Sequence, residues 1–160
     1  MQIRKGVGLL VIVKNEKGER VAVLQTRGAY NSEENRPQHY AGGCQVTVYG
    51  GINDGENEKE ALMREAREEL GEEFSKLIAS AKLERAGEFQ RGAEEGVIYS
   101  VELPESFFKI VRLGSDSGGL RQVLREEVMQ AKDLSQYKTG VPEGILAMFE
   151  DTKTILLKLL

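Results

Sequence analysis

Three glutamates near the middle of the chain have the spacing of a cation-binding cluster. Glu65, Glu68 and Glu69 stand at i, i+3 and i+4, which makes them neighbours on one face of a helix. Carboxylates this close repel one another, and in a helix built only for solubility lysines would be expected between them. A divalent cation removes the repulsion, and Mg²⁺ and Mn²⁺ prefer hard oxygen ligands. The spacing therefore favours a metal site, with a solvated charge-rich helix as the alternative.

A glycine-rich turn and a helix are expected to position this cluster. The turn covers residues 50–55, and Asn57 is a candidate N-cap for a helix over 58–70, which lacks proline and glycine. Gly71 follows where a helix often ends. The apolar positions recur every four residues, at Leu62, Ala66 and Leu70. They predict the face that packs on a core.

The stretch from Gly50 to Gly71 resembles the Nudix box, the signature motif of the Nudix hydrolase family. The motif reads G-x5-E-x7-R-E-U-x-E-E-x-G-U, where U is apolar. The matching residues are Gly50, Glu56, Arg64, Glu65, Glu68, Glu69 and Gly71, with Ala66 at the first apolar position. Seven fixed residues at about 7% frequency each match by chance on the order of once in 10⁸ starts. One position departs, because Glu72 stands at the last apolar position, where Phe74 is a candidate for the missing contact.

The resemblance implies which residues take part in a reaction. The implied metal ligands are the backbone carbonyl of Gly50 and the carboxylates of Glu65, Glu68 and Glu69. Mg²⁺ is the implied ion, with Mn²⁺ as an alternative. Glu56 and Arg64 would brace the junction between turn and helix, and Arg64 also counts with the three glutamates among the catalytic residues. From spacing alone, Arg64 can pair with Glu68 at i+4 or reach back to the glycine turn.

The general base and the substrate contacts lie partly outside the motif. Glu65 or Glu68 is expected to be the base, with Glu94 or Glu95 in a later connection as alternatives. Arg27, at the end of a predicted strand, is a candidate substrate-binding residue because Nudix proteins often carry an arginine near this place. A plain surface arginine is the alternative.

Strand-like segments surround the helix. Runs rich in β-branched residues predict strands at 3–13, 20–26, 44–49, 82–89, 96–103 and 107–113. Residues 72–81 are expected to add helical turns, 114–119 to form a flexible loop, and 120–134 to form a strand and a short helix. A final helix is expected to open at Pro142, with an apolar stripe that packs on the sheet or in a homodimer. The loop 28–43, which contains His39, is expected to border the cleft.

Strands around one internal and one terminal helix predict an α/β domain with a mixed sheet between helices. The resemblance sharpens this prediction to a Nudix-type α/β/α sandwich with a mixed β-sheet. The chain has 160 residues, enough for one core, so we expect a single domain over 1–160.

Composition and charge exclude several classes of protein. The net charge of −4 argues against a DNA or RNA backbone as partner, and no apolar run is long enough to span a membrane. The N-terminus lacks a signal pattern. Cys44 is the only cysteine, which excludes an internal disulfide and fits a cytoplasmic protein. We read it as a small buried residue.

The implied function is metal-dependent hydrolysis of a phosphoanhydride in a nucleoside diphosphate linked to another moiety, a nucleotide-type small molecule. The proline of some ADP-sugar enzymes and the tyrosine of dinucleoside-polyphosphate enzymes are both missing near 85–88. The aromatic residues that could stack on a base are Tyr30, Tyr40, Tyr49, Phe89 and Tyr99. Three alternatives remain: a binding module without catalysis, a prenyl-diphosphate isomerase, whose motifs do not surround Cys44, and a structural protein with a coincidental motif.

Overall fold

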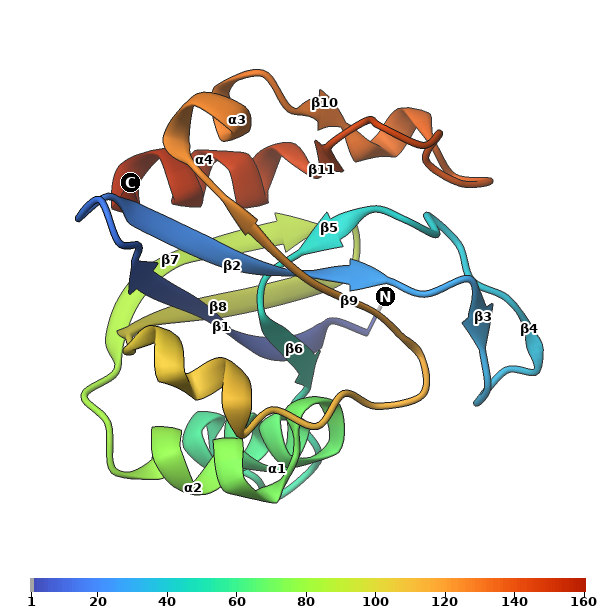
Figure 1. The fold of residues 1–160 in the computed structure, drawn as a ribbon. Helices are drawn as coiled ribbons and strands as arrows, with labels where there is room; N and C mark the ends of the chain where they lie inside the picture. Colours follow the sequence, from blue (N-terminus) through green and yellow to red (C-terminus); the bar gives the residue numbers. More distant parts are fainter. Residues whose placement is uncertain (1) are drawn as a thin grey trace.

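A mixed β-sheet lies between two layers of helices in the computed structural model, which describes residues 2–160 (Figure 1). The strands of this sheet are β1 (Arg4–Lys14), β2 (Arg20–Arg27), β5 (Cys44–Gln45), β6 (Val48–Gly51), β7 (Glu84–Arg91), β8 (Glu94–Glu102) and β9 (Ser117–Val123). The helices are α1 (Glu58–Leu70) and α2 (Glu72–Ala79) below it, with α3 (Arg125–Met129) and α4 (Glu150–Leu159) above it in Figure 1. The predicted α/β/α sandwich is confirmed.

Strand β1 runs through the centre of the sheet and is buried on both faces. Alternate side chains of a strand point to opposite sides. Val7, Leu9 and Val11 therefore join the core with α1 and α2, whereas Leu10 and Ile12 join the core with α3 and α4. β1 pairs antiparallel with β2 and parallel with β8, which makes the sheet mixed. The nearly continuous apolar run of the sequence is explained by this double burial.

The sheet forks where β1 and β2 separate. The two strands pair only over residues 11–14 and 20–23. Beyond this point β6 pairs with β1 and β5 pairs with β2. Thr47 sits at the fork, where its hydroxyl accepts a hydrogen bond from the Val11 amide at 2.9 Å and donates one to the Val23 carbonyl. The predicted strand 44–49 is thus divided into two short strands, and the fork opens beside α1.

Short elements complete the chain. β3 (Tyr30–Asn31) and β4 (Arg36–Pro37) form a small hairpin within the predicted loop, and β10 (Lys132–Asp133) pairs with β11 (Ala147–Met148). The prediction of a strand followed by a short helix over 120–134 is confirmed by β9 and α3, although β9 begins earlier, at Ser117. The predicted helical continuation after α1 is confirmed as α2.

Two predicted elements were wrong. The segment 107–113 is not a strand: it begins within a 3₁₀ helix, Glu105–Lys109, because Pro104 starts a turn and Phe107 is buried against Phe74. The final helix begins at Glu150 rather than at Pro142, since Gly144 takes a positive φ of 85° that interrupts a helix. The buried residues of α4 do pack on the sheet.

No helix in the described part of the chain is long and apolar enough to cross a membrane.

Candidate active site

The start of α1 is fixed by a capping box. The Asn57 side chain accepts a hydrogen bond from the Glu60 amide at 2.8 Å, and the Glu60 carboxylate accepts one from the Asn57 amide at 3.1 Å. These bonds satisfy two of the backbone donors that a helix leaves unpaired at its N-terminus. The helix covers 58–70 and Gly71 ends it, as predicted, so each glutamate of the motif has a defined direction.

Arg64 ties the glycine turn to the helix. Its Nε lies 2.9 Å from Glu56 Oε2, and its Nη2 donates to the Gly51 carbonyl at 2.8 Å. Hydrogen bonds from Arg64, and then from the Asn53 amide, lower the pKa of Glu56 to about 2. The i+4 contact with Glu68 is also present, but at 3.7 Å it is the longer one. Arg64 therefore has the geometry that a brace requires.

Glu65 lies directly against the backbone of Gly50. A Cβ atom at position 50 would come within 2.0 Å of the Glu65 carboxyl carbon, so this close approach requires glycine. Glu65 Oε1 accepts a hydrogen bond from Arg64 Nη1 at 2.6 Å. Burial still raises the pKa of Glu65 above its ordinary value, against the opposing effect of Arg64. The structure thus places a half-buried carboxylate against the Gly50 backbone.

Glu69 is the most deeply buried glutamate of the cluster and is only partly satisfied. Its Oε1 accepts a hydrogen bond from Gln25 Nε2 at 2.9 Å, whereas Oε2 is buried without a partner in good hydrogen-bond geometry among residues 2–160, although the Tyr49 amide and the Glu65 carboxyl are near enough to affect the Glu69 pKa. Burial, with a further contribution from the negative charge of Glu65, raises the pKa of Glu69 to about 8. A buried acceptor without a partner is costly and calls for an explanation.

The donor chemistry of this cluster fits a divalent cation. Glu68 lies at the open mouth of the cleft with 60% of its side chain exposed, and Glu69 Oε2 lacks a partner deeper inside. Among residues 2–160, no three His, Cys, Asp or Glu side chains are close enough to hold an ion alone. Mg²⁺ usually takes one or two protein carboxylates and completes its shell with water and substrate phosphate. The residues therefore fit an ion that is shared with substrate.

An open cleft of about 460 Å³, here called the acidic cleft, joins these glutamates to the fork of the sheet. Arg27, at the end of β2, lines its wall and donates to the His39 carbonyl at 3.0 Å and to Gln45 Oε1 at 3.0 Å. Burial, with a further contribution from the charge of Arg91, lowers the pKa of Arg27. The cleft thus sets a cation across from the carboxylates, an arrangement suited to a ligand that carries phosphates and a bound metal.

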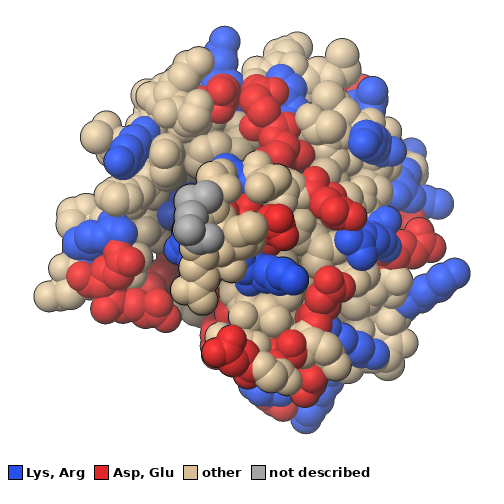
Figure 2. Space-filling model, turned by 180° about the vertical axis from the view of Figure 1, so that it is seen from behind, with Lys and Arg blue, Asp and Glu red and all other residues tan. Residues whose placement is uncertain are grey.

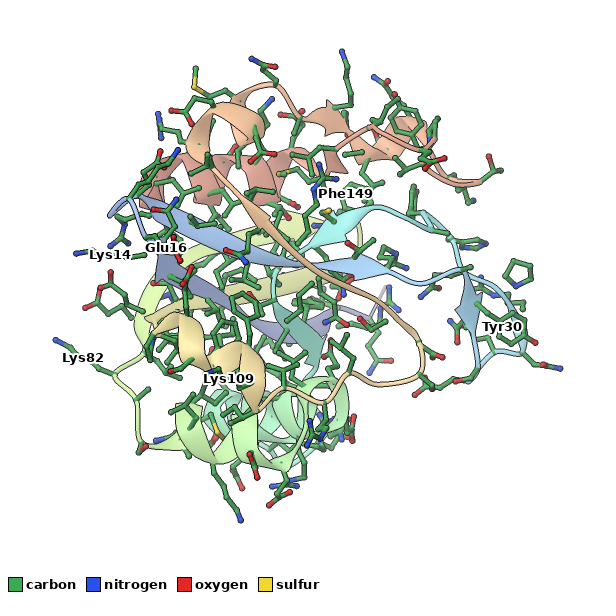
Figure 3. The ribbon with its side chains drawn as sticks, in the orientation of Figure 1. Lys14, Glu16, Tyr30, Lys82, Lys109 and Phe149 are labelled. Atoms are coloured by element: carbon green, nitrogen blue, oxygen red, sulfur yellow. The ribbon has the colours of Figure 1, made fainter. Side chains whose placement is uncertain are left out.

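The loop expected to border the cleft does so. Residues of 31–38 line one wall, and Gly114–Ser117 line another. Ser32 joins the two loops, because its hydroxyl donates to Asp116 Oδ2 at 3.0 Å. The ring of His39 is exposed, and only its backbone carbonyl contacts Arg27. Tyr30, labelled in Figure 3, lies on the β3–β4 hairpin at the edge of the molecule.

Gln25, whose amide also donates to the Thr47 carbonyl at 2.8 Å, is a residue of the cleft that was not predicted from the sequence. The signal was present, since Gln25 is a polar residue in an otherwise apolar strand and is only 5% exposed. Neither alternative base lines the acidic cleft: Glu94 accepts a hydrogen bond from Tyr49 at 2.7 Å in a neighbouring pocket, and Glu95 lines a groove on another face. Cys44 is buried, as predicted.

Charged side chains of both signs are interspersed over the rear face of the molecule, as Figure 2 shows. A binding surface for a phosphate backbone is recognised by clustered Lys and Arg. The whole chain carries a net charge of −4.

The fold and the motif together define a hydrolase of the α/β/α sandwich class with an acidic cleft. A family model described as NUDIX domain matches residues 4–146. The chain belongs to the Nudix hydrolase family and is a pyrophosphohydrolase acting on phosphoanhydrides. A search of curated proteins gave no match.

Solved structures show the same fold at low sequence identity. A mutT/nudix family protein from Listeria innocua is 14% identical, with 99% of this chain and 93% of that chain covered and a TM-score of 0.69. A C. elegans Ap4A hydrolase in a binary complex is 13% identical, with 98% and 95% covered and a TM-score of 0.62. A MutT protein from Methanosarcina mazei Go1 is 21% identical, with 85% and 87% covered and a TM-score of 0.54.

Proposed function

We propose that this protein is a metal-dependent pyrophosphohydrolase that cleaves a phosphoanhydride bond in a nucleoside diphosphate linked to another moiety. The observation that carries the proposal is the Glu69 carboxylate, which is buried, lacks a partner at Oε2 and lines the acidic cleft. A carboxylate in this state is unfavourable in the protein alone and becomes favourable when a cation is bound. Its position within the Nudix motif supports the same assignment.

The residues proposed to hold the ion are the Gly50 carbonyl and the carboxylates of Glu65, Glu68 and Glu69. We propose Mg²⁺, with Mn²⁺ as the alternative. When bound, such an ion neutralises phosphate charge and lowers the pKa of a water molecule. Arg64 would keep Glu65 against Gly50 through the 2.6 Å bond to its carboxylate, so that the ligands face the cleft before substrate enters.

The chain's own groups supply the remaining steps. Arg27 would orient the anionic substrate, since it lines the cleft wall and is anchored by two hydrogen bonds. Of the two expected bases, the geometry favours Glu68, because Arg64 engages Glu65 at 2.6 Å but approaches Glu68 only to 3.7 Å. Glu68 would take a proton from the attacking water at a carboxylate oxygen.

The proposal includes the setting of this activity. We place it in one domain over 1–160 in the cytoplasm, where a protein with a single buried cysteine is stable to reduction. The substrate is a nucleotide-type small molecule, and no DNA or RNA backbone is involved. A homodimer is the alternative to a monomer.

The test is formation of nucleoside mono- or diphosphate products, separated by chromatography, from a panel of nucleoside triphosphates, nucleotide sugars and dinucleoside polyphosphates with Mg²⁺ or Mn²⁺. Glu68→Gln and Glu69→Gln keep the side-chain shape and remove the charge. Glu73→Gln is the matched control, because Glu73 is exposed on α2 outside the acidic cleft. We expect turnover of at least one compound that both cleft variants lose and the control keeps. Metal binding without turnover across the panel would instead favour a binding module.

A further inference from the structure

Gln25 is a polar side chain in the buried part of β2. Val23 and Leu24 precede it on the strand and are fully buried, and Gln25 itself is almost as deeply buried where it lines the acidic cleft. A buried amide is costly unless its hydrogen-bonding groups are paired. The partners of this side chain therefore indicate why a polar residue stands at this position of the strand.

The Gln25 amide nitrogen donates two hydrogen bonds. Nε2 lies 2.8 Å from the Thr47 carbonyl oxygen and 2.9 Å from Glu69 Oε1. A side-chain amide carries two N–H donors, so these two bonds use both of them. If the oxygen and nitrogen of the amide exchanged places, an acceptor would face two acceptors. The orientation of the Gln25 amide is therefore fixed by its surroundings.

The other end of this arrangement is anchored in the centre of the sheet. Thr47 is fully buried, and its hydroxyl accepts a hydrogen bond from the Val11 amide at 2.9 Å and donates one to the Val23 carbonyl. A continuous chain of hydrogen bonds thus runs from β1 through Thr47 and Gln25 to Glu69 on α1. In Figure 1, β6 follows Thr47 and runs from the fork of the sheet towards α1. The Glu69 carboxylate is therefore tied to the sheet as well as to its own helix.

The two carboxylates Glu65 and Glu69 are held by groups of different charge. The Arg64 guanidinium holds Glu65, whereas Glu69 forms no ion pair with a Lys or Arg side chain among residues 2–160. A cation at position 25 would balance the charge of Glu69 and compete with a metal ion. A neutral amide donor fixes one oxygen of the carboxylate and leaves its charge to be balanced by an ion.

We propose that Gln25 is a positioning residue of the metal site, whose amide holds Glu69 Oε1 so that Oε2 is left for the ion. This inference rests on the proposed function and deepens it, because it assigns a residue outside the Nudix motif to the same site. Groups that hydrogen-bond a metal ligand fix its orientation, and their loss weakens metal binding by about 10- to 100-fold. In this role Gln25 acts through Glu69 and contacts neither the ion nor the substrate.

The first experiment measures Mn²⁺ affinity in Gln25→Met by electron paramagnetic resonance of the free ion. Methionine has nearly the same length as glutamine and lacks both donors. Ser75→Ala is the control, because the buried Ser75 hydroxyl donates to the Met63 carbonyl at 3.0 Å outside the acidic cleft. We expect both variants to lower the urea midpoint, and only Gln25→Met to weaken Mn²⁺ binding, by about 10- to 100-fold.

Unchanged Mn²⁺ affinity in Gln25→Met would overturn the inference. If that variant does not fold, Gln25→Asn decides in its place. Asparagine keeps the amide on a side chain that is one methylene shorter, so it cannot keep both hydrogen bonds. Mn²⁺ affinity equal to wild type in a folded Gln25→Asn would likewise overturn the inference.

A double-mutant cycle separates positioning from a purely structural role. In Glu69→Gln the new amide oxygen can still accept the hydrogen bond from Gln25, so Gln25→Met should destabilise the protein in either background. Its effect on Mn²⁺ affinity should disappear in the Glu69→Gln background, to within about twofold, because the ligand through which Gln25 acts is gone. Equal weakening of Mn²⁺ binding in both backgrounds would overturn the inference.

The inference and the proposed function fail in different ways. If Glu69→Gln weakens Mn²⁺ binding and Gln25→Met does not, the inference fails and the proposed metal site stands. If wild type and Glu69→Gln bind Mn²⁺ equally, or neither binds it, both fail. If Mn²⁺ binding depends on Glu69 and Gln25 but no compound of the substrate panel is hydrolysed, the hydrolase proposal fails and the positioning role of Gln25 stands.

Discussion

The glycine turn before α1 and the inner face of the helix each hold a carboxylate, and the pKa values of these two carboxylates are shifted in opposite directions. Glu56 in the turn accepts hydrogen bonds from Arg64 and from the Asn53 amide, and its pKa falls to about 2. Glu69, three turns along the helix, keeps one oxygen without a partner, and its pKa rises to about 8. The first arrangement is complete within the protein, whereas the second leaves one carboxylate oxygen for the ligand that we propose. A raised pKa in a cleft is typical of functional carboxylates, which is the role we propose for Glu69.

Arg64 produces this contrast. Its guanidinium contacts Glu56 and Glu65, and it approaches Glu68, but it has no contact with Glu69. The Arg64 guanidinium therefore neutralises Glu56 in the turn and orients Glu65, the first proposed metal ligand. It does not neutralise Glu69, the innermost proposed ligand. If lysines were interleaved along this face, the repulsion would be relieved and the demand for a metal ion would disappear.

The largest expected effect is on activity, in Glu69→Gln. We expect metal-dependent hydrolysis to fall by about two to three orders of magnitude, as for the loss of one charge-stabilising group in other enzymes. Thermal stability without metal should be little changed at pH 7, where Glu69 is protonated, and higher above about pH 8, where the variant removes a buried charge. Glu56→Gln should show the reverse stability result, with a lower Tm. Full activity in Glu69→Gln would contradict the proposed difference between Glu56 and Glu69.

The second effect is on stability, in Arg64→Met. The variant removes the partner of Glu56 and Glu65 and should lower the free energy of unfolding by about 1–3 kcal/mol. Arg67→Met is the matched control on the same helix, where an exposed ion pair with Glu72 contributes less than about 1 kcal/mol. Urea denaturation measures both. Equal losses in the two variants would show that Arg64 is an ordinary surface arginine.

The third effect is a pH dependence of the metal-free protein. The folded-state pKa of Glu69, about 8, lies above the ordinary value of 4.5. Between these values the folded state binds more protons than the unfolded state, so stability falls as pH rises from about 5 to about 8. We expect Tm in EDTA to decline over this range, and the decline to be smaller in Glu69→Gln. An identical profile in that variant would contradict the raised pKa.

The smallest expected effect is on the free energy of unfolding and concerns Glu72, the one position that departs from the motif. Glu72 is exposed on α2 and pairs with Arg67 at 2.9 Å, whereas Phe74 is fully buried in the core. Phe74 thus supplies the apolar contact. Glu72→Leu, which restores the motif, should change the free energy of unfolding by less than about 0.5 kcal/mol. A larger stabilisation by denaturant titration would mean that the helix end is poorly packed.

The motif region was predictable because its signals are local. Asn57, Gly71 and the apolar stripe of α1 each act within a few residues, and the observed helix has the predicted bounds. The strand over 107–113 failed because Phe107 and Phe108 resemble a strand pattern, while their burial against α2 is a tertiary contact. The composition of the segment 107–113 alone does not predict that contact.

The rest of the site depends on distant parts of the chain. Gln25 reaches Glu69 only because β1 and β2 separate at Thr47. The spacing of residues in the sequence does not predict where two strands separate. The smaller pocket of about 240 Å³ beside the acidic cleft combines residues from Arg27 to Ile155, and of its lining residues only Phe89 and Tyr49 were predicted to be able to stack on a base. The unpaired Oε2 atom of Glu69 likewise depends on how distant parts of the chain bury it.

The most direct test is calorimetric titration of Mn²⁺ at pH 7 in two buffers that differ in protonation enthalpy. Because the metal-free protein holds a proton on Glu69, whose pKa is about 8, binding should release about one proton. Glu69→Gln should bind Mn²⁺ more weakly and release almost none. Unchanged affinity and unchanged proton release in that variant would show that Glu69 is not a ligand and would contradict the account.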